Sequence, residues 1–314
     1  MPEGRTTRLC TARLDDVKLD RKQVAIWVAI SCASLFALIL IAQWLRTLPE
    51  VAEWISRYPG HTELPAGAPV GIPAWLGWQH FFNFFFIVFV IRTGWIIRSK
   101  KRPPAFWTPT KFRLNKNKPA QRMGLYHWFH IQMDFLWVLN GVVFIVLLFV
   151  TGQWMRIVPT SWDVFPNALS AGLQYASMTW PTDTAWVNYN SLQVLAYFTT
   201  VFIAAPIAIK TGLRLSPVWP KQGWMHRVFP EALARTLHVA VMFYFFVFIV
   251  AHVTLVMTTG VLRNLNIMFA ANDGTSWLGA GIFALSLIAI VVGWLLVRPS
   301  ILKPIAAWSG KVQG

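Results

Sequence analysis

Apolar residues fall into six long runs along the chain, separated by polar segments rich in proline, glycine or charge. Each run is about 20 residues or longer, which is the length an α-helix needs to cross the hydrocarbon core of a bilayer. Because backbone groups in lipid must be satisfied within the structure itself, runs of this kind favour helices. We expect transmembrane helices at 24–45, 74–97, 126–155, 190–212, 233–258 and 277–297.

Composition agrees with an all-α membrane protein. The 314-residue chain is 56% hydrophobic and 13% charged, which is too apolar for a soluble domain. Its formal net charge of +16 alone would suit nucleic acid, but the basic residues lie between apolar runs, as membrane topology requires. We therefore expect membrane lipid and no nucleic acid as a partner. The two cysteines, Cys10 and Cys32, form no CxxC or CxxCH motif, which excludes covalently attached haem and a cysteine-ligated iron–sulfur cluster.

The distribution of basic residues predicts the topology. The N-terminal 22 residues, the loops 98–122 and 210–235, and the C-terminal tail contain 6, 9, 5 and 3 basic residues. The three alternate loops contain 2, 1 and 1. By the positive-inside rule, six spans with this bias place both termini in the cytoplasm.

The fifth run, 233–258, carries His238 and His252, which are 14 positions apart. Fourteen steps leave two side chains about 40° apart around a helix and about 21 Å apart along it. One face of this helix therefore holds an imidazole near each surface of a hydrocarbon core that is about 30 Å thick. Imidazole is the commonest metal ligand and a usual axial ligand of haem iron.

The predicted topology gives the other histidines their depths. The second helix runs inward, so His80 lies near the outer surface, at the depth of His252. The third helix runs outward, so His130 lies near the inner surface, at the depth of His238. The sequence thus predicts two non-covalent b-type haems, each held by two histidines. His127 is the alternative to His130, which we favour because it lies deeper in the apolar run.

Two glycines fit the same picture. Gly94 is 14 residues after His80, and Gly141 is 11 residues after His130. Each lies near the histidine-bearing face of its helix, at the depth of the other haem, where a missing side chain would let a flat macrocycle approach. Ordinary helix packing by small residues remains the alternative.

Haem propionates need cationic partners near a surface, and Arg forks match carboxylates. Arg122 and Arg235 are the candidates at the inner haem, and Arg156 or Arg263 at the outer one, although each also serves as a topogenic charge. Asp134 follows the favoured inner ligand by one turn. An ionisable group at that depth is a functional candidate, either orienting the imidazole or passing protons to a quinone.

These residues resemble those of a known family. The pair His238 and His252, and His80 followed by Thr93–Gly94, resemble the di-haem cytochrome b subunits of the bacterial cytochrome b561/Ni,Fe-hydrogenase type, which include formate dehydrogenase gamma and thiosulfate reductase cytochrome b subunits. The resemblance covers 74–260 and implies a four-helix di-haem core there. Residues 1–73 and 261–314 then add one helix at each end. There is a departure: the family usually has an arginine a few residues before a His-Trp pair, whereas here Trp78–Gln79 precedes His80 and Phe81 follows it.

The resemblance implies an electron-transfer subunit in a bacterial cytoplasmic membrane, rather than a stand-alone catalyst. It would pass electrons between quinone and a partner oxidoreductase, which is often a molybdopterin or iron–sulfur enzyme. The added first helix inverts the core relative to the usual family orientation. The aromatic loop 156–189 is a candidate docking surface. The alternatives are the haem subunit of a transmembrane ferric or sulfoxide-type reductase, and a haem-free transporter whose histidines bind protons or metal ions.

Overall fold

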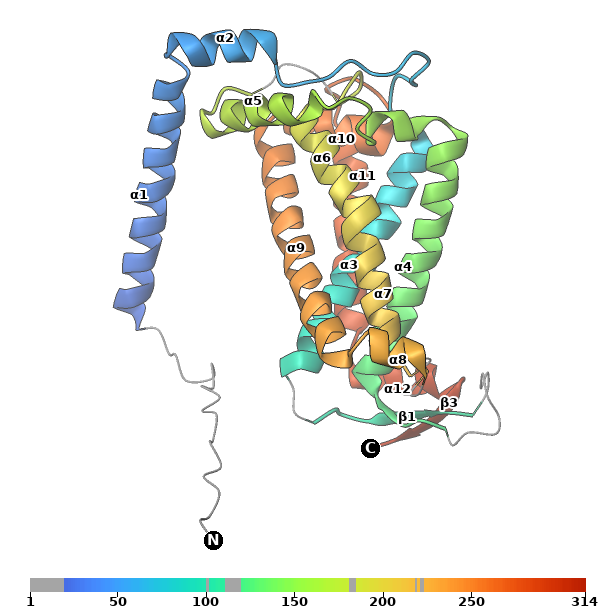
Figure 1. The fold of residues 1–314 in the computed structure, drawn as a ribbon. Helices are drawn as coiled ribbons and strands as arrows, with labels where there is room; N and C mark the ends of the chain where they lie inside the picture. Colours follow the sequence, from blue (N-terminus) through green and yellow to red (C-terminus); the bar gives the residue numbers. More distant parts are fainter. Residues whose placement is uncertain (1–19, 100–101, 111–119, 181–184, 218, 221–222) are drawn as a thin grey trace.

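The computed structural model describes residues 20–99, 102–110, 120–180, 185–217, 219–220 and 223–314. In this part of the chain six helices are long and apolar enough to cross a membrane, in agreement with the all-α membrane fold expected from the sequence. Most of the N-terminal segment, and residues 100–101 and 111–119 of the basic loop 98–122, lie outside the described residues. Figure 1 shows five of the spans gathered in a bundle and the first standing apart from it.

Each span corresponds to one helix, except the fourth, which is made of three consecutive segments. The spans are α1 (Arg21–Leu45), α3 (Ala74–Ser99), α4 (Leu125–Val150), α6 (Ser191–Phe198) continued by η3 (Thr199–Ala204) and α7 (Ala205–Leu215), α9 (Glu231–Thr258) and α11 (Leu278–Leu296). Within the bundle, α3 packs along α4 and α7 packs along α9. These two helix pairs enclose the candidate site.

Short helices cover one end of the bundle, which we call the cap end and define as residues 46–73, 151–180, 185–190 and 259–277. It contains α2 (Pro49–Arg57), η2 (Gln153–Arg156), α5 (Val164–Ala176) and α10 (Val261–Ala270). Figure 1 shows α2 and α5 lying across the ends of the spans. Arg156 is buried here, and its guanidinium donates hydrogen bonds to the carbonyl oxygens of Gly71, at 2.5 Å, and Ala185. One arginine therefore ties two loops of the cap together.

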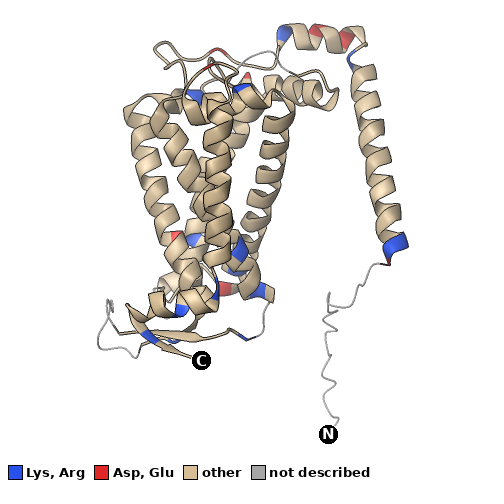
Figure 2. Cartoon of the chain, turned by 180° about the vertical axis from the view of Figure 1, so that it is seen from behind, with Lys and Arg blue, Asp and Glu red and all other residues tan. Residues whose placement is uncertain are grey.

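A small sheet closes the opposite end, which we call the sheet end. Its strand order is β2–β1–β3, with β1 (Phe106–Pro109) antiparallel to β2 (Met123–Gly124) and to β3 (Gly310–Gln313). The short helices α8 (Trp224–Val228) and α12 (Pro299–Ala307) lie at the same end. Figure 2 shows Lys and Arg at both ends, with acidic residues beside them mainly at the cap end.

The fourth span contains a π-helical segment, Thr199–Ala204, in the middle of the membrane-crossing helix. The backbone nitrogen of Ala205 donates to the carbonyl of Thr200, five residues earlier. Pro206 follows at once, and a proline ring in a regular α-helix collides with the carbonyl four residues before it. The wider π turn relieves that collision without ending the helix.

Three buried clusters hold the bundle together at successive depths. One at the sheet end joins Phe89 and Leu125 to Leu302 of α12, and one at the cap end joins Leu148 to Ile267 of α10. A third lies between them, and we call it the middle layer: Ile87, Ala204, Val241 and Phe245, with partly buried aliphatic and aromatic side chains around them. The sheet-end cluster also includes Val297 and Ala306, so the tail packs as part of the bundle.

Several segments differ from the sequence-based expectation. The third helix ends at Val150 rather than 155, because Gly152 adopts a left-handed backbone with φ of 74° and η2 follows. The segments expected as loops contain α2, α5, α8 and α10, and the strand β1 lies in the segment 98–122 expected to be irregular.

Candidate functional site

The structure brings four histidines together as two pairs. His80 of α3 and His252 of α9 have ring centroids 6.1 Å apart and form the cap-end pair. His130 of α4 and His238 of α9 have ring centroids 6.4 Å apart and form the sheet-end pair. These are the two couples that charge counting placed at matching depth. His130 rather than His127 faces His238.

The spacing within each pair can be compared with that of two imidazoles on opposite sides of one metal ion. Metal–imidazole bonds are about 2 Å long, and each nitrogen is roughly 1 Å from its ring centre, so the ring centres would lie about 6 Å apart. Both observed separations match this value. No group of three or more His, Cys, Asp or Glu side chains able to hold a metal ion occurs in the described residues. Two imidazoles at this spacing could hold a metal that brings its other ligands with it, as haem iron does.

Threonine hydroxyls hold both rings of the sheet-end pair. Thr93 Oγ1 lies 2.9 Å from Nδ1 of His130, and Thr211 Oγ1 lies 2.9 Å from Nδ1 of His238. Both threonines are fully buried. Since Nδ1 of each ring is engaged, Nε2 is the nitrogen that each imidazole can offer to a metal.

The glycine after each threonine lies beside the imidazole, where an added Cβ would make an ordinary van der Waals contact. A Cβ on Gly94 would lie 3.4 Å from Cε1 of His130, and one on Gly212 would lie 3.5 Å from Cε1 of His238. Gly94 thus lies beside the sheet-end pair, at the depth expected from the sequence. A Cβ on Gly141 would meet no described atom within 4 Å. Close helix packing therefore does not explain Gly141, and its role at a haem stays a prediction.

Aromatic rings surround the cap-end pair. Phe248 stacks on His252 with ring centroids 5.7 Å apart and an angle of 5° between the planes, and Tyr197 approaches the same ring at 6.3 Å. Phe269 of α10 meets His80 edge-on at 5.7 Å. Nδ1 of His80 is buried and has no hydrogen-bond partner among the described residues. The cap-end pair is therefore held by ring packing, whereas the sheet-end pair is held by hydrogen bonds.

The middle layer separates the two pairs. Phe245 lies halfway along α9 between His238 and His252 and packs edge-on against Trp137 of α4, with ring centroids 6.0 Å apart. Trp137 Nε1 in turn donates to Oδ1 of Asn83, at 2.7 Å. An apolar, aromatic layer at this depth keeps the environment between the pairs low in dielectric constant.

The charged residues singled out in the sequence have varied surroundings. Arg235 forms a largely exposed ion pair with Glu231, at 2.7 Å, and the guanidinium of Arg122 lies 3.8 Å from the ring centroid of Phe106. Their contact with propionates stays a prediction. The Asp134 carboxylate lies 3.5 Å from Nε2 of His130, one turn before it in α4. It therefore approaches the other ring nitrogen from the one that Thr93 contacts, Nδ1.

The two arginines considered for the outer haem are engaged at the cap end. Arg156 binds two backbone carbonyls, and burial lowers the pKa of its guanidinium. Arg263 forms two hydrogen bonds to Asp273, at 2.7 and 2.9 Å. The hydrogen bond from Arg263 holds the pKa of the Asp273 carboxyl below its ordinary value.

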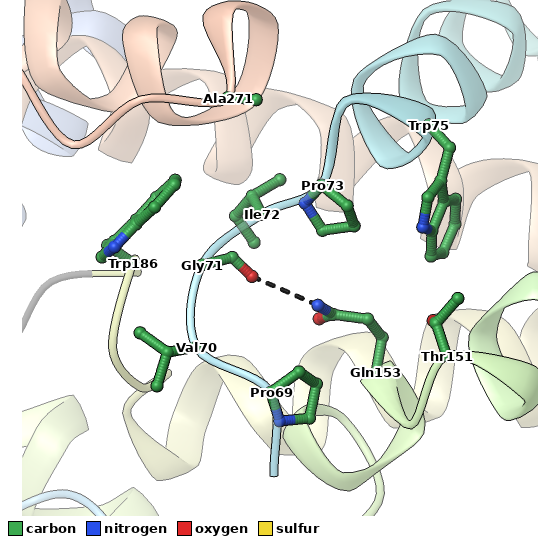
Figure 3. Close-up of a pocket in the computed structure, with 10 residues that line it drawn as sticks. All are labelled: Pro69, Val70, Gly71, Ile72, Pro73, Trp75, Thr151, Gln153, Trp186 and Ala271. Carbon is green, nitrogen blue, oxygen red and sulfur yellow. Dashed lines mark hydrogen bonds between the residues drawn. The ribbon is translucent and has the colours of Figure 1, made fainter.

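A cavity of about 440 Å³ opens at the cap end, and none of the histidine pairs lines it. Figure 3 shows the chain from Pro69 to Pro73 beside it, with Trp75 and Trp186 on opposite sides. Gln153 donates to the Gly71 carbonyl across the cavity, at 3.2 Å. No titratable side chain lines this cavity, so it offers shape and aromatic surface rather than acid–base or redox chemistry.

Fold and site together define a multi-pass integral membrane protein with two histidine pairs separated along one helix. No family model, curated protein or solved structure matches the chain.

Sequence reasoning named Thr93 only as part of the family resemblance, did not name Thr211, and gave neither threonine a contact with a histidine. A signal for them is present: the chain contains Ile91–Arg92–Thr93–Gly94 and Ile209–Lys210–Thr211–Gly212, a four-residue segment repeated with only the basic residue exchanged. Compared side by side, the two copies would have pointed to Thr211 and Gly212 in a span that contains no histidine.

Proposed function

We propose that this chain is a di-haem b cytochrome that carries electrons between the two sides of a membrane. The observation that carries the proposal is the spacing of the two histidine pairs, which suits bis-imidazole ligation at two depths. The two histidines of each pair would hold one haem and leave its iron no free position, which favours electron transfer over the binding of oxygen or substrate. Haem supplies the one-electron chemistry when bound, and the chain supplies ligands, orientation and a water-poor surrounding.

The sheet end is the cytoplasmic side in this proposal. The excess of basic over acidic residues in the segments 98–122, 210–235 and 298–314 supports that orientation, because the helices that flank these segments end at the sheet end. The cap-end pair would then lie toward the outer surface of a bacterial cytoplasmic membrane. The large cap, with its aromatic residues, is the surface we assign to a partner oxidoreductase of the molybdopterin or iron–sulfur class.

Quinone is the second redox partner in the proposal. Trp75 lines the cap cavity and precedes His80 by five residues, about 7.5 Å along the helix. A planar ring in this cavity would therefore come close to the cap-end pair. Asp134, beside the sheet-end pair, is the corresponding candidate for proton transfer if quinone exchange occurs at the other end.

Haem content and its dependence on single histidines test the proposal. Purified protein in detergent should show the reduced-minus-oxidised α bands of b haem at two haems per chain. His80→Ala and His130→Ala should each retain one haem, whereas the matched control His127→Ala should retain two. Protein without Soret absorption would overturn the proposal and favour a haem-free transporter with histidine-based proton or metal sites. Reduction of ferric chelates or sulfoxides by the haem-loaded protein alone would instead favour the reductase alternative.

A further inference from the structure

The repeated Ile-basic-Thr-Gly segments face the two rings of one histidine pair. Thr93 lies on α3 and contacts His130 of the neighbouring helix α4, and Thr211 lies on α7 and contacts His238 of the neighbouring helix α9. Each contact therefore joins the two members of a packed helix pair. The same chemical arrangement occurs twice, once for each ring, with the same Oγ1–Nδ1 distance of 2.9 Å.

The proton on each threonine hydroxyl is already committed to the backbone. Thr93 Oγ1 lies 2.6 Å from the carbonyl oxygen of Phe89, and Thr211 Oγ1 lies 2.7 Å from that of Ile207. Two oxygens this close require a proton between them, and a hydroxyl has only one to give. The hydroxyl must therefore accept from the imidazole, so Nδ1 carries the hydrogen in both rings and Nε2 keeps its lone pair.

We propose that Thr93 and Thr211 are positioning residues that fix both sheet-end imidazoles with bare Nε2 atoms and lower the midpoint potential of the haem held between them. The inference rests on the proposed function. A hydrogen bond donated from the far nitrogen makes an imidazole a stronger electron donor to its metal. A stronger donor stabilises ferric over ferrous iron, so the two hydroxyls favour the oxidised haem.

The cap-end pair provides a contrast within the same molecule. Nδ1 of His80 is buried with no hydrogen-bond partner, and no hydrogen bond to the ring of His252 is found among the described residues. Removal of the threonine hydroxyls should therefore change the sheet-end haem alone.

The experiment uses the His80→Ala protein, which retains only the sheet-end haem under the proposed function. Thr93→Val and Thr211→Val are introduced separately, because valine keeps the shape of threonine and removes the hydroxyl. Thr93→Ser and Thr211→Ser restore it. Thr236→Val, on α9 two residues before His238, is the matched control, since its hydroxyl bonds only the carbonyl of Ala232. Midpoint potentials are read from α-band redox titrations, and haem content is measured in parallel.

Each valine variant should change the ratio of ferric to ferrous affinity by up to about tenfold, which raises the midpoint potential by up to about 59 mV. The serine variants and Thr236→Val should titrate as the parent does. Valine variants that keep their haem with an unchanged potential would overturn the inference, as would serine variants that shift as far as valine. The two threonines lie on different helices, so poor folding of one variant leaves the other as an independent test. Failure of the proposed function is distinguishable, because the parent protein would then contain no haem.

Discussion

The depth difference between the two histidine pairs predicts that electron exchange between them responds to membrane potential. His238 and His252 are 14 residues apart on one helix, which is about 21 Å along its axis. This is roughly 0.7 of a hydrocarbon core about 30 Å thick. Moving one charge across the whole core costs about 2.3 kcal/mol per 100 mV. Transfer between the pairs should therefore change by about 1.6 kcal/mol per 100 mV, or roughly 15-fold in the equilibrium ratio.

The assay uses the purified protein in sealed lipid vesicles, poised so that one electron is shared between two haems. A potassium diffusion potential of about 100 mV is imposed with an ionophore, and the α bands of the two haems are followed. Electrons should move toward the haem on the positive side and return when the gradient is collapsed. The His80→Ala protein, with one haem, is the control and should show no redistribution. A shift in the ratio of less than about twofold would refute two redox centres separated across the bilayer by the apolar middle layer.

Three further predictions concern the scaffold. A Cβ on Gly279 would lie 2.5 Å from backbone atoms of α10, so Gly279→Ala should lower the free energy of unfolding by about 1–3 kcal/mol. A Cβ on Gly281 in the same helix would meet no described atom within 4 Å, so Gly281→Ala should leave the stability unchanged. Thermal unfolding in detergent measures both effects. Arg156→Met removes two charged hydrogen bonds from the cap and should cost about 3 kcal/mol or more, with faster hydrogen exchange confined to the cap; a uniform change would contradict this. The hydrogen bond from Arg263 lowers the pKa of Asp273. The ion pair therefore stabilises the fold fully above the ordinary pKa of an aspartate, and this stabilisation is lost as the pH falls through the lowered pKa. Asp273→Asn should accordingly flatten the acid side of a plot of Tm against pH.

The six spans could be predicted because the length of an apolar run is a local property with a direct physical meaning in lipid. The end of the third span could not, since nothing in the run up to 155 distinguishes Gly152 from other helical glycines until its left-handed backbone is seen. The short helices of the cap are amphipathic segments flanked by proline and glycine, where the pattern is weak. The strands β1 and β3 pair across about 200 residues of sequence, and such a distant register cannot be deduced from either strand alone.

The histidine pairs could be predicted from the sequence for a different reason. Charge bias gives each helix a direction, direction gives each histidine a depth, and depth reduces the possible partners to one or two. His130 could be preferred to His127 only by its deeper position, and the structure turns its ring toward His238. The threonines remained hidden because a hydroxyl in a membrane helix usually bonds its own backbone, as Thr254 does with Val250. Only the neighbouring ring distinguishes Thr93 and Thr211 from such residues.

The π segment of the fourth span behaves as one residue inserted into an otherwise regular helix. In the part of the span that follows the π segment, every side chain is rotated by about 100° about the helix axis from its position in an uninterrupted α-helix. Evolutionary loss of a single residue between 199 and 204 would straighten the span, rotate Thr211 off the ring of His238 and bring Pro206 into collision with the preceding turn. The helical register of the fourth span, rather than any contact at its ends, thus determines whether its Thr211 can contact His238 on the fifth span.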